Sequence, residues 1–315
     1  MTEYLYPSSV EEAIGHLEAY DGEARIIAGG TDVLPDIRKR KIHPRCLVDV
    51  TRIPGLDQIR VSLRAVSDDF VEVGAAVTFA TIKNSPFLNR HVHALVDAAR
   101  SVGAVAIQNA ATWVGNIVQA MPAADGAIVA IALEAEARVV DRHGAIWQPV
   151  ESLFEGPGVS NVDPSRQVVT HVRFPRHRSP WGTAWARVGR RPSLVLPILN
   201  CAAKLCLDPD GVRVTRACMA LGPVAPRPFR AREAEAFLIG ESADVEVFAQ
   251  AARIAQGEAD PRSSLMRASR EYRLAVIPSL VSDVLSAAAV AAKRAGSRNR
   301  HTLEGHSDGT NAERN

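Results

Sequence analysis

Hydrophobic and polar residues follow one another along the chain with the periods of short helices and short buried strands. Near the beginning, Ala13, Ile14 and Leu17 share one face of a predicted helix, which starts near Val10 behind a serine cap. The short, mainly apolar run 25–28 leads into two glycines, which is typical of a buried strand that ends in a tight turn. The pattern predicts layers of strands and helices from the first residues onward.

The same rules predict strands and helices in mixed order over the rest of the chain. Helices are expected over residues 33–40, 95–102, 124–133, 231–238, 245–256 and 269–295, the last one kinked or broken at Pro278. Strands are expected over residues 46–50, 71–74, 137–140, 183–188, 194–207 and 212–221. This order favours an α/β or α+β fold over a helical bundle.

The length of 315 residues fits two domains. The polar segment 175–180 (PRHRSP), which is bracketed by prolines, is the best candidate linker between them. We therefore expect one domain over residues 1–176 and a second over residues 181–295. Residues 296–315 are polar and rich in Asn, Arg, Gly and Ser, so they are predicted to be a disordered tail.

Composition excludes several classes of protein. Hydrophobic residues make up 47% of the chain, charged residues 23%, and the net charge is only +2, so neither a nucleic acid nor a membrane surface is an expected partner. The N-terminus lacks the pattern of a signal peptide, and no uncharged apolar run reaches the length of a membrane span. These features predict a cytoplasmic protein. The four cysteines form no CxxC pair and are expected to be buried thiols, without a metal site.

Several well-known motifs are missing from the sequence. No GxGxxG supports a Rossmann site, no Gly-Lys dipeptide supports a P-loop, and neither HExxH nor GxSxG occurs. His91 and His93 lie two residues apart in a polar stretch and are expected to be exposed to solvent. No catalytic residue is therefore predicted in this chain.

A first candidate binding segment joins the strand at 25–28 to the next helix. It consists of Ala28, Gly29, Gly30, Thr31 and Asp32. Two successive positions without side chains let backbone N–H groups approach an anion closely, next to the positive end of a helix. A plain tight turn, in which Thr31 or Asp32 caps the helix, explains the segment about as well.

A second candidate segment places short polar side chains in an otherwise apolar stretch. Thr112, Gly115 and Asn116 come first, and Asp125 follows after Pro-Ala-Ala. Such groups suit hydrogen bonds to the hydroxyls and phosphates of a ligand, and a bound cofactor would satisfy them. Asp125 also fits a purely structural position in the first turn of a helix.

Together, the two segments resemble the FAD-binding medium subunit of the xanthine dehydrogenase and carbon monoxide dehydrogenase family. The opening residues 6–13 (YPSSVEEA) resemble that family's usual beginning. Residues 220–228 (ALGPVAPRP), Arg230 and residues 271–273 (EYR) resemble the signature of its C-terminal flavoprotein domain. The resemblance covers roughly residues 3 to 290.

The resemblance implies an α+β fold in which a two-lobed FAD-binding domain of the PCMH type is followed by a smaller CO-dehydrogenase flavoprotein domain. The lobes are expected over residues 1–55 and 56–176. The cofactor is expected to be FAD, with its pyrophosphate on the backbone of residues 28–32. Further contacts would come from Thr112, Gly115 and Asn116, and Asp125 would bind the ribityl chain or the ring. Leu34 and Ile107 are expected apolar contacts.

The resemblance also implies a role as an electron-transfer subunit. A large partner subunit that binds molybdenum and its pterin would oxidise the substrate, and a small partner with two [2Fe–2S] clusters would pass the electrons to FAD. The final acceptor would be NAD, oxygen or another molecule, and the complex would be a heterotrimer. The protein would place the flavin and tune its potential.

Some residues depart from the family pattern. Val114 stands where a glycine is usual and Trp113 where an aliphatic residue is usual; Gln108 and Ala106 replace a common arginine and glutamine. A valine restricts the backbone, which predicts one altered contact between an amide and a phosphate. The segment 28–50 is most similar to the medium subunit of 4-hydroxybenzoyl-CoA reductase, but the cysteine-bearing insertion that holds an iron–sulfur cluster there is missing.

Two other functions are compatible with this sequence. The chain would be a self-contained flavin oxidase if it turned over a small alcohol or amine alone. It would be a scaffold without flavin if the residues at 113 and 114 abolished FAD binding.

Overall fold

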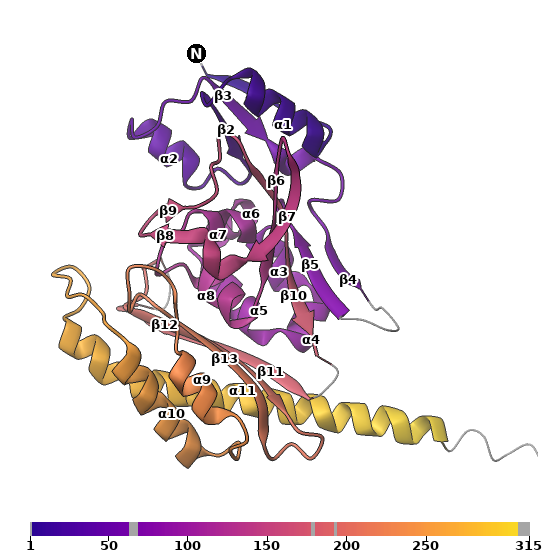
Figure 1. Ribbon diagram of the computed structural model, residues 1–315, viewed down its shortest axis with the longest axis vertical. Helices are drawn as coiled ribbons and strands as arrows, with labels where there is room; N and C mark the ends of the chain where they lie inside the picture. Colours follow the sequence, from indigo (N-terminus) through magenta and orange to yellow (C-terminus); the bar gives the residue numbers. More distant parts are fainter. Residues whose placement is uncertain (1, 63–68, 178–179, 192–193, 308–315) are drawn as a thin grey trace, which may run out of the picture.

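Three larger β-sheets follow one another along the long axis of the molecule, with helices between them and on the outside (Figure 1). Among the described residues, a fourth sheet is a two-stranded hairpin. The computed structural model describes residues 2–62, 69–177, 180–191 and 194–307. The first two sheets and their helices belong to the N-terminal part of the chain. The third sheet, in pink and salmon in Figure 1, and the last helices, in orange and yellow, form the C-terminal part.

The first sheet is small and parallel, with strand order β1-β3-β2. Ser9 caps the first helix, because its side chain accepts a hydrogen bond from the N–H of Glu12. Ala13, Ile14 and Leu17 are buried, as the sequence pattern predicts. The elements are β1 (Glu3–Leu5), α1 (Val10–Ala19), β2 (Ala24–Ile27), α2 (Val33–Arg38), β3 (Cys46–Asp49) and the short helix η1 (Val50–Arg52).

The second sheet is antiparallel, with strand order β4-β5-β10-β6-β7. Its strands are β4 (Ile59–Ser62), β5 (Asp69–Gly74), β6 (Glu136–Asp141), β7 (Gly144–Pro149) and β10 (Val168–Arg176). The helices between β5 and β6 are α3 (Phe79–Asn84), α4 (Pro86–His91), α5 (His93–Ser101), α6 (Val105–Ala110), α7 (Trp113–Val118) and α8 (Asp125–Ala132). The helix η2 (Val150–Leu153) and the hairpin of β8 (Phe154–Gly156) and β9 (Val159–Ser160) precede β10.

The third sheet is antiparallel and lies between helices of the N-terminal part and helix α11. Helices α5 and α8 pack on it from the N-terminal part, and α11 packs on it from the C-terminal part. All nine residues of β12 are buried as a result. The elements are β11 (Trp181–Val188), β12 (Leu199–Leu207), β13 (Val214–Gly222), β14 (Phe229–Arg230), α9 (Arg232–Leu238), α10 (Val245–Glu258) and α11 (Arg270–Ser307).

The described residues form two hydrophobic cores: one lies within the C-terminal part, and the other joins the N-terminal part to one face of the third sheet. In the C-terminal core, the two signature segments of the sequence meet in space. Arg273 is 2% exposed, and its Nη1 donates a hydrogen bond to the carbonyl of Pro223 at 2.8 Å. A buried arginine needs such partners, because an unpaired buried charge is costly. The contact fixes the start of α11 against the loop after β13.

Helix α11 continues through Pro278, so of the two predicted alternatives the break is wrong, and the kink stays a prediction. Proline removes one hydrogen bond of the helix, and packing on both sides of it compensates. Ile277, Val281, Val284 and Leu285 are buried in the C-terminal core, so this apolar stripe of α11 packs within its own domain.

The structure corrects three predicted boundaries. The helix runs on to Ser307, so the predicted tail is wrong for residues 296–307; no proline interrupts the chain after Pro278, and residues 308–315 lie outside the described residues. Strand β10 includes Pro175 and Arg176, which pair with Phe70 and Asp69, so the predicted linker starts too early. Strand β12 begins at Leu199 rather than at residue 194.

One helix of the described residues is long and apolar enough to cross a membrane by length and composition alone, namely residues 270–297 of α11. Its apolar stripe lies in the C-terminal core, against the sheet of β11 and β12. Core helices of folded domains have this pattern as well.

Candidate functional site

The turn between β2 and α2 holds the first predicted binding segment. Gly30 has a φ of +67°, a left-handed conformation that glycine adopts without strain. Within the described part of the chain, the N–H groups of residues 29–32 donate no hydrogen bond. Asp32 occupies the cap position of α2, but its side chain makes no cap hydrogen bond. The turn therefore presents several free N–H groups, as an anion site requires.

Gly29 brings the two predicted segments together. A Cβ atom at this position would lie 1.9 Å from the carbonyl oxygen of Ala110 and 3.0 Å from the Cα of Ala111. The backbone of the turn is thus in direct contact with the residues just before Thr112. Only glycine allows this approach, because a side chain would overlap with the backbone of its neighbour.

Helix α7 carries the second predicted segment. The Thr112 hydroxyl accepts a hydrogen bond from the N–H of Gly115 at 3.0 Å and caps the helix. Thr112 is 3% exposed, whereas Gly115 and Asn116 are half-buried. The helix is placed by two backbone contacts, since Trp113 donates to the carbonyl of Val77 and Phe79 donates to that of Ala111.

Asn116 faces the beginning of α8. Its Oδ1 atom is buried and has no hydrogen-bond partner among the described residues. A Cβ atom at Gly126 would lie 2.6 Å from this oxygen, so the close approach of α7 and α8 also depends on a glycine. Asp125, the first residue of α8, lies next to Gly126. The two predicted segments, including Asp125 at the end of the second, therefore converge in space.

The C-terminal part of the chain holds the Asp125 carboxylate. Asn200 of β12 donates to its Oδ1 at 2.6 Å, and Ser101 donates to its Oδ2 at 3.1 Å. Arg187 of β11 lies 3.4 Å from Oδ2. Burial raises the pKa of Asp125 above its usual range, and the hydrogen bond from Asn200 opposes part of this shift.

Sequence reasoning missed Asn200 and Arg187. Asn200 is fully buried and also donates to the carbonyl of Ala123 at 3.2 Å. A lone asparagine inside an apolar strand was the available signal, because a buried amide must find partners. Lys204, four residues later on the same face of β12, donates to Glu134 and to the carbonyl of Leu133 at the other end of α8. Side chains of strand β12 therefore form hydrogen bonds at both ends of α8.

Gln108, which departs from the family pattern, has a structural role. Its Oε1 accepts a hydrogen bond from the Nζ of Lys83 at 3.0 Å. Its Nε2 donates to the carbonyls of Arg100 and Val102 at the end of α5. The side chain is 5% exposed and links three helices behind the predicted site.

The two other notable departures also lie in the core. Trp113 is fully buried, and its Nε1 donates to the carbonyl of Gly126 at 2.8 Å. Val114 is 4% exposed and belongs to a regular helical turn, so its backbone conformation does not require glycine. Neither side chain projects from α7 toward solvent.

We expect the substitution Val114→Gly to lower the free energy of unfolding by about 2–3 kcal/mol without tightening FAD binding. The loss combines a cavity in the core with the low helix propensity of glycine. Urea unfolding measures the stability, and a fluorescence titration with FAD measures the affinity. A variant that binds FAD more tightly and keeps its stability would contradict this reading of Val114.

Leu34 and Ile107 are large apolar residues that are exposed to solvent, with exposed fractions of 45% and 39%. Leu34 lies beside Gly30, and Ile107 lies beside Gly103 in the loop before α6. Both are available as apolar contacts for a bound cofactor, in keeping with the expectation from sequence.

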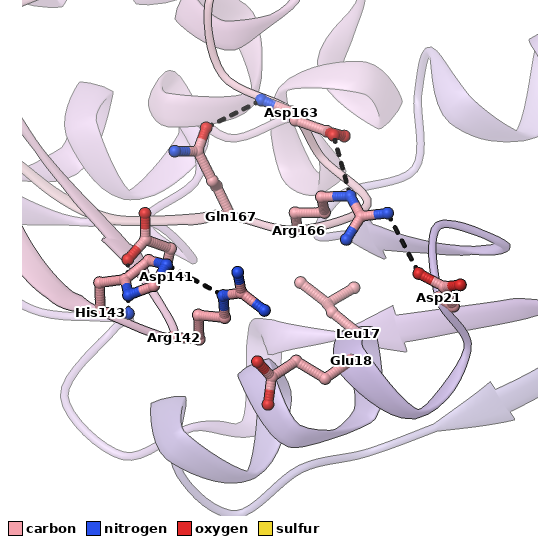
Figure 2. Close-up of a pocket in the computed structure, with 9 residues that line it drawn as sticks. All are labelled: Leu17, Glu18, Asp21, Asp141, Arg142, His143, Asp163, Arg166 and Gln167. Carbon is pink, nitrogen blue, oxygen red and sulfur yellow. Dashed lines mark hydrogen bonds and ion pairs between the residues drawn. The ribbon is translucent and has the colours of Figure 1, made fainter.

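A separate cavity of about 390 Å³ lies between α1 and the β6–β7 turn (Figure 2). Its charges largely pair with one another. Arg166 contacts Asp21 at 3.1 Å and Asp163 at 3.9 Å, and Arg142 donates to His143. None of the predicted FAD segments lines it.

The four cysteines are buried free thiols. Burial raises the pKa of Cys201 far above its ordinary value, which keeps the thiol protonated. Among the described residues, no group of three His, Cys, Asp or Glu side chains is arranged to hold a metal ion.

Two family profiles match the chain. One, described as the FAD binding domain in molybdopterin dehydrogenase, covers residues 1–177. The other, described as the CO dehydrogenase flavoprotein C-terminal domain, covers residues 185–288.

Curated relatives match over most of their length. The chain is 30% identical to the nicotinate dehydrogenase FAD-subunit of Eubacterium barkeri over 78% of this chain and 81% of that protein. It is 28% identical to the putative xanthine dehydrogenase FAD-binding subunit XdhB of Escherichia coli K12 over 92% of this chain and 96% of that protein.

Solved structures agree with these relatives. A chain of carbon monoxide dehydrogenase from Hydrogenophaga pseudoflava superposes with a TM-score of 0.83 at 28% identity, over 92% of this chain and 98% of that chain. A chain of quinoline 2-oxidoreductase from Pseudomonas putida 86 gives 0.81 at 29% identity, over 93% and 98%. The predicted α+β fold of two domains is confirmed. This chain belongs to the FAD-binding subunits of the molybdenum hydroxylase family and is an electron-transfer flavoprotein.

Proposed function

We propose that FAD binds where the β2–α2 turn meets α7 and the start of α8, and that the protein uses it to pass electrons from an iron–sulfur subunit to an external acceptor. The observation that carries this proposal is the direct contact of Gly29 with the backbone at Ala110. It joins two segments, each of which suits an anionic ligand, into one site.

The residues present fit FAD in three respects. The turn at Gly30 offers free N–H groups for a pyrophosphate. The buried Oδ1 of Asn116 lacks a donor among the described residues, and a ligand hydroxyl would supply one. Leu34 and Ile107 expose apolar surface that a flavin or adenine ring would cover.

Each predicted residue then has a distinct task. Residues 28–32 hold the pyrophosphate through their backbone, and the N–H groups around Gly115 extend this contact. The Thr112 side chain acts mainly as the cap that fixes α7. Asn116 binds the ribityl chain. Asp125 receives Arg187 and Asn200 from the C-terminal domain and so keeps that domain against the site.

FAD supplies two-electron acceptance together with one-electron transfer, which suits it to link iron–sulfur clusters to NAD or oxygen. We further propose that the partners are a large molybdenum–pterin subunit and a small [2Fe–2S] subunit, in a cytoplasmic heterotrimer. The medium chains of nicotine 6-hydroxylase and carbon monoxide dehydrogenase, which are named as parts of larger enzymes, support this assembly.

An absorption spectrum of the purified chain, followed by heat release of the cofactor, tests the FAD site. Flavin bands near ~370 and ~450 nm with FAD in the supernatant are the expected result. A chain that stays colourless after FAD is added, alone and with its partner subunits, would refute the site. Turnover of a small alcohol or amine by the isolated chain would instead favour a self-contained oxidase.

A further inference from the structure

A second cavity, of about 540 Å³, lies where the two domains meet on the side of α4, α5 and α11. Figure 1 shows α4, the end of β10 and the beginning of β11 coming together there above α11. Its volume falls in the range of small-molecule sites, roughly 300–1,000 Å³. The basic side chains that line it are Arg90, His91, His93, Arg176, His177 and Arg294.

The cavity carries an excess of positive charge. Asp97 is the acidic residue among its lining side chains, and it is already paired with Arg100 at 3.0 Å. Arg90, Arg176 and Arg294 make no ion pair with any residue that the structure describes. Arginine binds phosphate and carboxylate groups with two parallel hydrogen bonds, so this lining favours an anionic ligand.

Helix α5 adds to the positive potential. It begins at His93, which lines the cavity, and the N-cap residue Val92 makes no side-chain cap hydrogen bond. The N–H of Ala94 donates to the Thr183 hydroxyl of β11 at 3.2 Å, which ties the helix end to the cavity wall. The N-terminus of a helix carries a partial positive charge that attracts anions.

Two tryptophans form the wall on the β11 side. Trp181 and Trp185 lie four residues apart on the same strand and therefore on the same face. The indole Nε1 of Trp185 is buried and has no acceptor among the described residues. An aromatic wall with an unmet donor suits a ligand that has a flat ring and polar atoms.

We propose that this cavity binds a small phosphorylated ligand of mononucleotide size, with its phosphate on the arginines and its ring against Trp185. The cavity is distinct from the FAD site. Arg187, which contacts Asp125, lies at the other end of β11, and the six residue steps from Trp181 to Arg187 span about 20 Å. The ligand is thus an additional one, bound where the two domains touch.

The test is a calorimetric titration of the FAD-saturated chain with AMP, adenosine and inorganic phosphate. FAD saturation prevents adenylate from entering the flavin site. AMP is expected to bind at least about tenfold more tightly than adenosine or phosphate alone, because it engages the arginines and the tryptophan together. Phosphate that binds as tightly as AMP would overturn the mononucleotide assignment.

Three variants locate the binding. Arg90→Gln and Arg294→Gln should each weaken AMP by about tenfold, and Trp185→Phe should weaken AMP but not phosphate. Arg142→Gln, which removes a cation from the cavity of Figure 2, is the matched control and should leave AMP binding unchanged. The flavin content of every variant reports correct folding.

Two results would overturn the proposal. One is the absence of saturable binding at millimolar AMP in a chain that retains its flavin. The other is equal loss of AMP binding in Arg142→Gln and Arg90→Gln. If the chain does not bind AMP and an acidic partner subunit covers the arginines, the cavity is a protein contact instead.

Discussion

Replacing Gly29 with alanine is expected to weaken FAD binding by about 30- to 150-fold. The new Cβ would lie 1.9 Å from the Ala110 carbonyl oxygen, far inside the contact distance. The overlap forces the β2–α2 turn away from α6 and α7, at a cost of about 2–3 kcal/mol, and separates the two segments that we assign to FAD. A fluorescence titration of the flavin-free chain with FAD measures the change.

Gly15→Ala is the matched control for this substitution. Gly15 lies in helix α1, and nothing approaches within 4 Å of a Cβ at its position. This variant should keep the affinity for FAD and gain roughly 0.5–1 kcal/mol of stability from the higher helix propensity of alanine. Circular dichroism of both variants shows whether they are folded. Unchanged FAD affinity in a folded Gly29→Ala variant would disprove the shared site.

The second large effect is expected from Lys204→Met, which should lower the free energy of unfolding by about 3 kcal/mol. Lys204 is fully buried, and its Nζ donates to Glu134 and to the carbonyl of Leu133. Without the lysine, Arg216 is the one charged partner that Glu134 keeps among the described residues, in two hydrogen bonds of 3.1 and 3.0 Å. Thermal and urea unfolding of the flavin-loaded protein measure the loss.

The same cluster predicts a dependence of stability on pH. Burial opposes the ionisation of Glu134, but Lys204 and Arg216 outweigh it and lower the pKa from 4.5 to about 2. A lowered pKa in the folded state stabilises the protein above about pH 4.5, and this contribution is lost as the pH falls toward 2. It amounts to about 2 kcal/mol after allowance for partial exposure. Urea unfolding at pH 2.5 and pH 5 should show the difference, and the double variant Lys204→Met/Glu134→Gln should show less of it.

Lys41→Met is the control for the lysine. Lys41 forms a surface ion pair with Asp36 at 3.0 Å, and its side chain is 62% exposed. Exposed pairs of this kind contribute less than about 1 kcal/mol. Equal losses of stability in Lys41→Met and Lys204→Met would mean that burial does not strengthen the interdomain pair.

Local patterns predicted the elements that form the site. The glycines at 29 and 30 and the cap residue Thr112 are visible in the sequence, because turns and caps depend on the residue types at fixed positions. The family resemblance then indicated FAD, and the comparisons confirm it. The roles of the individual residues toward FAD stay predictions.

Contacts between distant parts of the chain could not be predicted from the sequence. Nothing local indicates that Gly29 touches Ala110, or that Asn200 and Lys204 reach the two ends of α8. A strand that is buried on both faces shows no alternation of polar and apolar residues. The pattern therefore does not indicate which face of the sheet its few polar side chains lie on. Tertiary packing also overrode the local rule at Pro278.

Strand β12 has a consequence for how the protein melts. Its residues divide between the two hydrophobic cores, with Ala202 and Cys206 in one and Cys201 and Ala203 in the other. If either core unfolds, one face of β12 loses the side chains that pack against it. The two domains should therefore unfold as a single cooperative unit, with one calorimetric transition whose van't Hoff and calorimetric enthalpies agree.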